Sequence, residues 1–333
     1  MKQTSMTATP SAASSPLASH EARAGLDPSS RLIIEEAERR GIVVEVLAPA
    51  AEYFRLRLGG RSIVCRESLS ELTTAVALSR CDDKRTTARI LREAGLRTPE
   101  QVEAGSSASN ETFLRDLGQV VVKPARGEQG RGISIGIRTA EALQWAIERA
   151  AEVGTPVLLE ELVQGQDLRL VVIDHRLVAA AIRKPPSVRG DGVQTIEALI
   201  RQQSARRQEE TQGASRIPLD AETRRCVQEA GYTLSDILPE EEDLTVRGAA
   251  NVHLGGTIRD VTQQLHPALA AVASQASRAL DIPVVGLDLI VRSIHEPEYW
   301  ILEANERPGL ANHEPQPTAA RFVDFLFPES KRD

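Results

Sequence analysis

The sequence has few cysteines, and their positions do not suggest cross-links. Cys65, Cys81 and Cys226 stand far apart among 333 residues. An odd number of cysteines without metal-ligand spacing argues against a disulfide framework and favours a reducing compartment such as the cytoplasm. We interpret all three as ordinary core or surface thiols.

The sequence also lacks a surplus of positive charge and a long apolar run. Its 40 Lys and Arg against 47 Asp and Glu give a formal net charge of −7. Basic and acidic residues alternate, as in RLIIEEAERR, which is typical of a solvated helix face and not of a nucleic-acid surface. No apolar run approaches the roughly 18 residues of a membrane span, and no apolar signal core is visible. We therefore expect a soluble globular protein that contacts neither nucleic acid nor a membrane.

Composition and periodicity divide the chain into segments. Residues 1–28 are rich in Ala, Ser, Thr and Pro without periodicity, which predicts a disordered tail. Residues 29–80 indicate a helix that begins near Ser30, a strand, a hairpin and a second helix, and so a small α/β domain. Helices and strands continue from 81 to 330 without an internal repeat. Within them, the polar stretch 201–216 is either a mobile loop or a charged surface helix.

A glycine-rich segment follows a predicted strand. The stretch VVKPARGEQGRGIS ends an apolar run with Lys123 and continues with Gly127, Gly130 and Gly132. Glycines let backbone N–H groups approach a ligand closely, and with lysines they suit a polyphosphate. No Gly-Lys-Ser or Gly-Lys-Thr follows, so this is not a Walker A loop. Alone, such a loop is weak evidence, because a surface turn can have the same composition.

Two predicted strands near the C-terminus carry acidic residues. In YWILEAN, strand alternation places Glu303 and Asn305 on one face, and a neighbouring VVGLDLIV can put Asp288 beside them. All-oxygen ligation of this kind suits magnesium, which completes its shell with phosphate and water. The alternative is an edge hairpin with solvated acids. Lys84 and Lys123 favour the metal site, because magnesium would bridge the polyphosphate that they contact.

These stretches, with PVLLEELVQGQD and LEANERPG in the same order, resemble the ATP-grasp superfamily of carboxylate–amine ligases. The resemblance covers roughly residues 80 to 326. RLVVIDHRLVAAAIRKPPSVRGDGVQTIEALI and TVRGAANVHLGGTIRDVTQQLHP are similar to cyanophycin synthetases and glutathione-forming ligases. ESLSELTTAVALSRCDDKRTTARILREAGL and NERPGLANHEPQPTAARFVDFLFP resemble the ligase portion of N-acetylglutaminylglutamine synthetases. In that family an acetyltransferase domain precedes the ligase, so the resemblance implies a separate acetyltransferase for any acetylated product.

The resemblance implies an α/β ATP-grasp fold, in which two subdomains clamp ATP behind a small pre-ATP-grasp domain. The nucleotide-binding subdomain would span about 81–163, and the metal- and substrate-binding subdomain about 164–330. The implied cofactors are ATP and Mg²⁺, with Mn²⁺ as a substitute. The implied partners are small amino-acid substrates, and a homo-oligomer is left open.

The resemblance also implies roles for residues whose chemistry permits them. Nucleotide contacts are expected from Lys84, Lys123, Gly127, Gly130, Gly132, Ser134, Glu160, Glu161, Leu162, Val163 and Asp167. Metal ligands are expected to be Asp288, Glu303 and Asn305. Catalytic contacts to the transferred phosphoryl group are expected from Arg183, Arg247 and Asn251. Substrate contacts are expected from Arg169, Gly255, Gly256 and Arg307. Each arginine has the alternative of a plain surface charge, and His175, His253 and His313 are interpreted as structural.

The implied activity is ATP-dependent amide formation through an acyl phosphate, with glutaminylglutamine-type dipeptide synthesis as the expected reaction. One alternative is a cyanophycin- or glutathione-like ligase with other amino acids. Another is an ATP-binding sensor or partner module without chemistry. The complete set of Asp288, Glu303 and Asn305 favours a ligase, since a binding module has less need of a full metal site.

Overall fold

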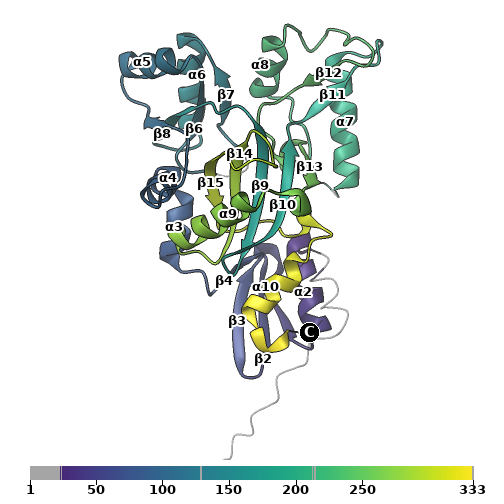
Figure 1. The fold of residues 1–333 in the computed structure, drawn as a ribbon. Coiled ribbons are helices and arrows are strands. Elements are labelled where there is room, and N and C mark those ends of the chain that lie inside the picture. Colours follow the sequence, from purple (N-terminus) through teal and green to yellow (C-terminus); the bar gives the residue numbers. More distant parts are fainter. Residues whose placement is uncertain (1–22, 24, 128–129, 212, 214, 332–333) are drawn as a thin grey trace, which may run out of the picture.

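The fold consists of a central sheet with three smaller units around it (Figure 1). The computed structural model describes residues 23, 25–127, 130–211, 213 and 215–331. Every strand pair in the named sheets is antiparallel. No helix in this described part of the chain combines the length and the apolar composition that crossing a bilayer requires.

The N-terminal unit is a meander of strands packed against helix α2. Its elements are α2 (Pro28–Arg39), β1 (Val43–Ala48), β2 (Tyr53–Leu58), β3 (Arg61–Arg66) and β4 (Leu69–Ser70). Most of the predicted tail lies outside the described residues, but its last residues are folded, and Leu26 is buried. Asp27, and not Ser30, is the N-cap of α2, because its carboxylate accepts hydrogen bonds from the backbone N–H groups of Ser29 and Ser30.

The C-terminal helix α10 (Thr318–Leu326) completes this N-terminal unit. It packs on α2, and Phe322 and Leu326 share one buried cluster with Ile33 and Phe54. Val171 of the central sheet belongs to the same cluster. The small domain expected at residues 29–80 therefore depends for its core on segments far along the chain.

The central sheet has the strand order β13-β10-β9-β14-β15. Its strands are β13 (Thr257–Asp260), β10 (Arg176–Lys184), β9 (Gln166–Ile173), β14 (Val284–Val291) and β15 (Tyr299–Asn305). Helices α3 (Ala75–Asp82), α4 (Lys84–Glu93) and α9 (Pro267–Leu280) pack against it and bury its apolar side chains. Helix α4 lies within the range expected for the nucleotide-binding subdomain, yet its Leu91 is buried in this central core.

We call residues 101–161 the β6 unit. It comprises β5 (Gln101–Glu103), α5 (Ser107–Leu117), β6 (Val120–Pro124), β7 (Ser134–Ile137), α6 (Ala140–Ala151) and β8 (Val157–Glu161). The strand predicted before the glycine-rich segment is confirmed as β6. The sheet order β5-β8-β6-β7 leaves β7 at an edge, directly after the glycine-rich segment.

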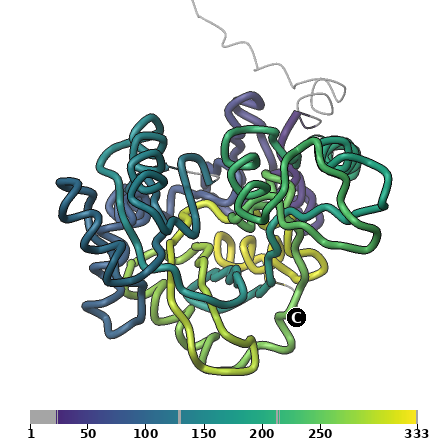
Figure 2. Tube along the Cα trace, turned by 90° about the horizontal axis from the view of Figure 1, so that it is seen from above, coloured from purple at the N-terminus to yellow at the C-terminus, as the bar shows by residue number. Residues whose placement is uncertain are grey.

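We call residues 187–245 the α8 unit. It comprises β11 (Ser187–Arg189), α7 (Ile196–Glu210), α8 (Ala221–Glu229) and β12 (Asp243–Thr245). The polar stretch at 201–216, interpreted as a loop or a charged helix, is helical up to Glu210, with ion pairs such as Glu197–Arg201 along its surface. Seen from above, the teal β6 unit and the green α8 unit stand on either side of the molecule (Figure 2).

Candidate active site

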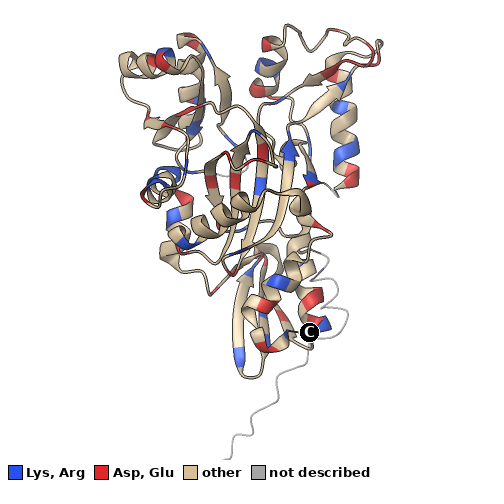
Figure 3. Cartoon of the chain, viewed as in Figure 1, with Lys and Arg blue, Asp and Glu red and all other residues tan. Residues whose placement is uncertain are grey.

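A cavity of about 690 Å³ is bounded by the β6 unit, the central sheet and the segment 248–251. The predicted site residues that line it are Lys123, Gly130, Glu160, Glu161, Leu162, Val163, Asp167, Arg183, Asn251, Asp288 and Glu303. The cavity therefore brings together residues that are more than 180 positions apart in the sequence. Charged residues of both signs lie on neighbouring strands of the central sheet (Figure 3).

Lys123 and Glu160 form a buried ion pair at one wall of the cavity. They lie on the adjacent strands β6 and β8, and Lys123 Nζ is 2.7 Å from Glu160 Oε1, with both side chains 5% exposed. Burial raises the pKa of the Glu160 carboxyl, while the charge of Lys123 opposes that rise. Beside the pair, the end of strand β8 and the two residues after it, 161–163, also line the cavity.

The strand register places three charged residues in one row across the central sheet. Asp288 on β14 is the direct partner of Arg169 on β9 and of Glu303 on β15. Arg169 Nε lies 2.9 Å from Asp288 Oδ1, and Arg183 Nη2 lies 3.1 Å from Asp288 Oδ2. Arg183 also donates to Asp167 Oδ1 at 2.8 Å, its partner in the next pair of strands. The register confirms that VVGLDLIV pairs with YWILEAN and places Asp288 beside Glu303, as the sequence predicts.

Lys84 connects the glycine-rich segment to this row. Its Nζ lies 3.4 Å from Glu303 Oε2 and donates to the carbonyl of Gly127 at 3.1 Å. Burial favours the neutral form of Glu303, but Lys84, the contact with Asp288, Lys123 and Arg169 together outweigh it and hold the pKa of that carboxyl below its usual range. Burial raises the pKa of Asp288 to about 6 despite Arg169 and Arg183. Of the two facing carboxyl groups, Asp288 is therefore the one that takes up a proton first.

Asn305 lies on the same face of the hairpin as Glu303, as the alternation predicts. The direct partner of Asn305 on β14 is Gly286, and the side-chain nitrogen Nδ2 of Asn305 lies 3.4 Å from Asp288 Oδ2. The side chains of Asp288, Glu303 and Asn305 thus lie together on one face of the hairpin, and each carries oxygen that could bind a metal. In the described part of the chain, no three His, Cys, Asp or Glu residues form a metal-binding group. The set of Asp288, Glu303 and Asn305 contains only two carboxylates.

The charged side chains around Asp288 and around the Lys123–Glu160 pair sum to zero net charge when all of them are ionised. The acids are Asp167, Glu160, Asp288 and Glu303, and the bases are Lys84, Lys123, Arg169 and Arg183. Fully ionised ATP would add four negative charges to this neutral group, and divalent cations at the oxygen donors would offset them. The donor set therefore fits magnesium with a nucleotide.

Leu302 also lines the cavity, and strand alternation does not predict it. Asp288 pairs with Glu303 but Leu289 pairs with Ile301, so Leu302 is the extra residue of a β-bulge. The bulge turns two successive residues, one apolar and one acidic, towards the same cavity. Ile133, Ile135 and Ile290 add further apolar surface.

Several residues with predicted roles lie outside this cavity lining. Ser134 is buried and accepts a hydrogen bond from Arg149, and a Cβ at Gly132 would lie 3.0 Å from Val153. Arg247 lines a second cavity of about 220 Å³ on the other side of Gly130.

Gly255, Gly256 and Arg307 also lie outside the lining of the main cavity. A Cβ at Gly256 would lie 2.8 Å from the carbonyl of Asn251, which indicates a backbone-packing role, and Gly255 adjoins it. Arg307 pairs with Glu67 at 3.2 Å. The roles assigned to all these residues stay predictions.

Comparisons with known proteins identify relatives among amino-acid ligases. No protein-family model matches the chain. It is 31% identical to the cyanophycin synthetase of Trichormus variabilis over 323 residues, which are 92% of this chain and 36% of that protein. It is 28% identical to the glutathione biosynthesis bifunctional protein GshAB of Listeria innocua over 322 residues, which are 91% of this chain and 41% of that protein. The chain thus spans less than half the length of these curated relatives.

A solved structure supports the fold independently. The bifunctional glutathione synthetase from Pasteurella multocida superposes with a TM-score of 0.63 at 22% identity, over 93% of this chain and 44% of that chain. The predicted fold class is therefore confirmed. By fold the chain is an ATP-grasp protein, and by sequence it is similar to amino-acid ligases.

Proposed function

We propose that the chain is an ATP-dependent ligase that joins the carboxylate of one small amino-acid substrate to the amine of another. The observation that carries the proposal is the single cavity in which the buried Lys123–Glu160 pair faces Asp288 and Glu303. Relatives named as a cyanophycin synthetase and as a glutathione biosynthesis protein support the same class of reaction.

The cavity offers complementary groups to each part of ATP. Lys123 in the cavity wall and Lys84, which pairs with the cavity residue Glu303, would contact the phosphates, and the backbone of residues 161–163 would contact the adenine edge. Asp167 contacts Arg183 through Oδ1, so its Oδ2 would accept from the ribose hydroxyl groups. Asp288, Glu303 and Asn305 would hold magnesium, which supplies positive charge to the phosphate oxygens.

The reaction overcomes the poor electrophilicity of a carboxylate. A substrate carboxylate oxygen attacks the γ-phosphorus of ATP, and ADP leaves. The amine of the second substrate then attacks the acyl carbon, phosphate leaves, and the nitrogen loses a proton. Arg183 in the cavity would stabilise negative charge on the transferred group, and no covalent enzyme intermediate is needed.

The finer proposal concerns the substrates. On the resemblance to N-acetylglutaminylglutamine synthetases, we propose a glutamine-like carboxylate substrate and a small amine. Neither step requires that the ligase itself perform acetylation. Cyanophycin-like or glutathione-like amino-acid pairs are the alternative substrates within the same chemistry.

The test is incubation with ATP, magnesium and amino acids in pairs, with and without N-acetylglutamine, followed by mass spectrometry and ADP and phosphate assays. A new amide with stoichiometric ADP and phosphate is the expected result. ATP turnover that yields only a stable phosphorylated product would indicate a kinase. ATP binding without turnover for any pair would favour the alternative of a sensor or partner module.

A further inference from the structure

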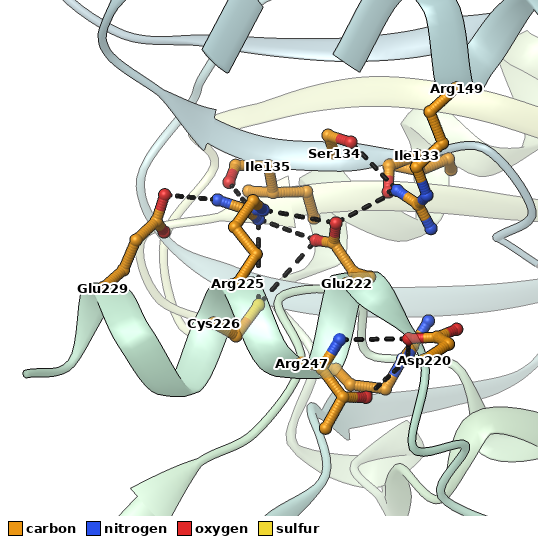
Figure 4. Close-up of polar contacts among 11 residues, drawn as sticks. Ile133, Ser134, Ile135, Arg149, Asp220, Glu222, Arg225, Cys226, Glu229 and Arg247 are labelled. Carbon is orange, nitrogen blue, oxygen red and sulfur yellow. Dashed lines mark hydrogen bonds and ion pairs between the residues drawn. The ribbon is translucent and has the colours of Figure 1, made fainter. Parts of the chain in front are cut away.

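Glu222 on helix α8 joins two arginines from different units of the fold. The side chain is 4% exposed, and it accepts from Arg149 Nη1 at 3.0 Å and from Arg225 Nη2 at 2.6 Å (Figure 4). Arg149 belongs to the β6 unit, whereas Glu222 and Arg225 belong to the α8 unit. One buried carboxylate thus links two units that are otherwise separate in sequence.

The two arginines also bind the backbone of strand β7 and of Ile133, the residue directly before it. Arg149 Nη1 donates to the carbonyl of Ile133 at 3.0 Å, and Arg225 Nη2 donates to the carbonyl of Ile135 at 2.9 Å. Because β7 is an edge strand, its outer backbone groups have no neighbouring strand and need other partners. The guanidinium groups supply those partners, and Glu222 fixes both of them in place.

The side chains of these same two residues line the main cavity. Ile133 and Ile135 both contribute to its wall, and a Cβ at Gly248 would lie 3.2 Å from Ile135 Cβ. A shift of the β7 edge would therefore move the apolar wall against the packed segment at Gly248. Glu222 itself does not line the cavity, so its influence passes through the arginines and the backbone of β7.

We propose that Glu222 is a positioning residue, which fixes the Ile133–Ile135 wall of the nucleotide cavity by holding Arg149 and Arg225 against the edge of β7. Without this carboxylate, two positive guanidinium groups lie close together with less opposing charge and separate. The carbonyls of Ile133 and Ile135 then lose their partners. The inference rests on the proposed function in one respect, namely that the cavity bounded by Ile133 and Ile135 binds a nucleotide.

The experiment compares Glu222→Gln with the matched variant Glu229→Gln. Glu229 accepts from Arg225 Nη1 at 2.5 Å but is half exposed and contacts only that arginine of the pair. The expected result is a roughly tenfold weaker apparent affinity for ATP with magnesium in Glu222→Gln and a change within about twofold in Glu229→Gln. We further expect a higher KM for ATP with kcat less affected, since Glu222 touches no reacting group.

Amide hydrogen exchange of residues 133–137, measured without nucleotide, provides a readout that does not depend on the function. Faster exchange in Glu222→Gln than in Glu229→Gln supports the proposal, and equal exchange with equal ATP affinity overturns it. If Glu222→Gln does not fold, Arg225→Met replaces it, because methionine has no N–H to donate to Glu222 or to the Ile135 carbonyl; unchanged exchange at Ile135 then overturns the proposal. A wild-type protein that fails to bind ATP contradicts the proposed function, while the exchange comparison still tests Glu222.

Discussion

The buried pair of Lys123 and Glu160 allows stability and nucleotide binding to be separated by substitution. Lys123→Met removes the charge 2.7 Å from the Glu160 carboxylate and leaves that acid inside the protein. Burial already raises the pKa of Glu160 with Lys123 present, so without Lys123 the carboxyl takes up a proton on folding. The adjacent Lys84 lowers the pKa of Glu160 less than Lys123 does.

The magnitude follows from the ordinary pKa of the acid. Protonating a carboxyl group of pKa 4.5 at pH 7 costs about 3.4 kcal/mol, at about 1.36 kcal/mol for each pH unit. We expect Lys123→Met to lower the free energy of unfolding at pH 7 by up to that amount. The folded variant binds a proton that the unfolded chain releases above pH 4.5, so its stability falls as pH rises from 4.5 to 7. The deficit relative to wild type therefore disappears near pH 4.5.

The assay is urea denaturation at pH 7 and pH 5, together with ATP binding. The double variant Lys123→Met/Glu160→Gln is the control, because it removes both charges and should recover most of the stability. If Lys123 contacts the phosphates, the double variant binds ATP more weakly than wild type even though its stability is recovered. Equal deficits at both pH values would refute the protonation argument, and wild-type ATP affinity in the double variant would refute the phosphate contact.

Three further predictions follow from the site and its surroundings. Glu303→Gln should abolish ADP release while the variant still folds, because it removes one charge from the proposed magnesium site without opening a cavity; a thermal melt checks the fold, and wild-type turnover in saturating magnesium would reject that site. Gly130→Val should raise the KM for ATP, since Gly130 has a φ of +73° and a Cβ there would lie 3.4 Å from Leu254 Cδ1. Gly136→Val is its control, because Gly136 has a φ of +77° but open space around it; equal KM values in the two variants would make the glycine segment a mere surface turn. Burial lowers the pKa of His313 from 6.5 to about 4, so the unfolded chain binds a proton that the folded chain does not, and stability falls as pH drops from 6.5 to 4. His313→Asn should reduce this loss by up to about 3 kcal/mol, measured as urea stability against pH, and an unchanged slope would contradict the assignment.

The acidic hairpin was predictable because its geometry is local. Alternation within VVGLDLIV and YWILEAN is enough to put Asp288, Glu303 and Asn305 on one face, provided that the two strands pair. The strands are close in sequence and joined by a short connection, so the pairing is the simplest available. The bulge at Leu302 was not predictable, because it depends on the register of the pair and not on the composition of either strand.

Non-local packing explains what the local sequence pattern did not reveal at the N-terminus. The sequence of residues 29–80 has the pattern of a complete small domain, yet its core includes Phe322 and Leu326 from the last helix. Nothing in the local periodicity of either segment encodes their contact. The cap of α2 was misplaced by three residues for a related reason, because Asp27 follows a stretch whose composition resembles a disordered tail.

Motif reading and structure also differ in what they reveal about the glycine-rich segment. The motif identifies Gly130 and Lys123 by their chemistry, and both line the cavity. Glu222 lies about 90 residues away in a helix with no recognisable motif, and its neighbours Arg225 and Glu229 resemble a solvated helix face. Only the position of α8 beside the β7 edge turns one of these ordinary charges into a buried bridge. Residues that line the cavity are therefore readable from their chemistry, whereas residues that bind arginines against a strand of its wall become visible only once the fold shows their neighbours.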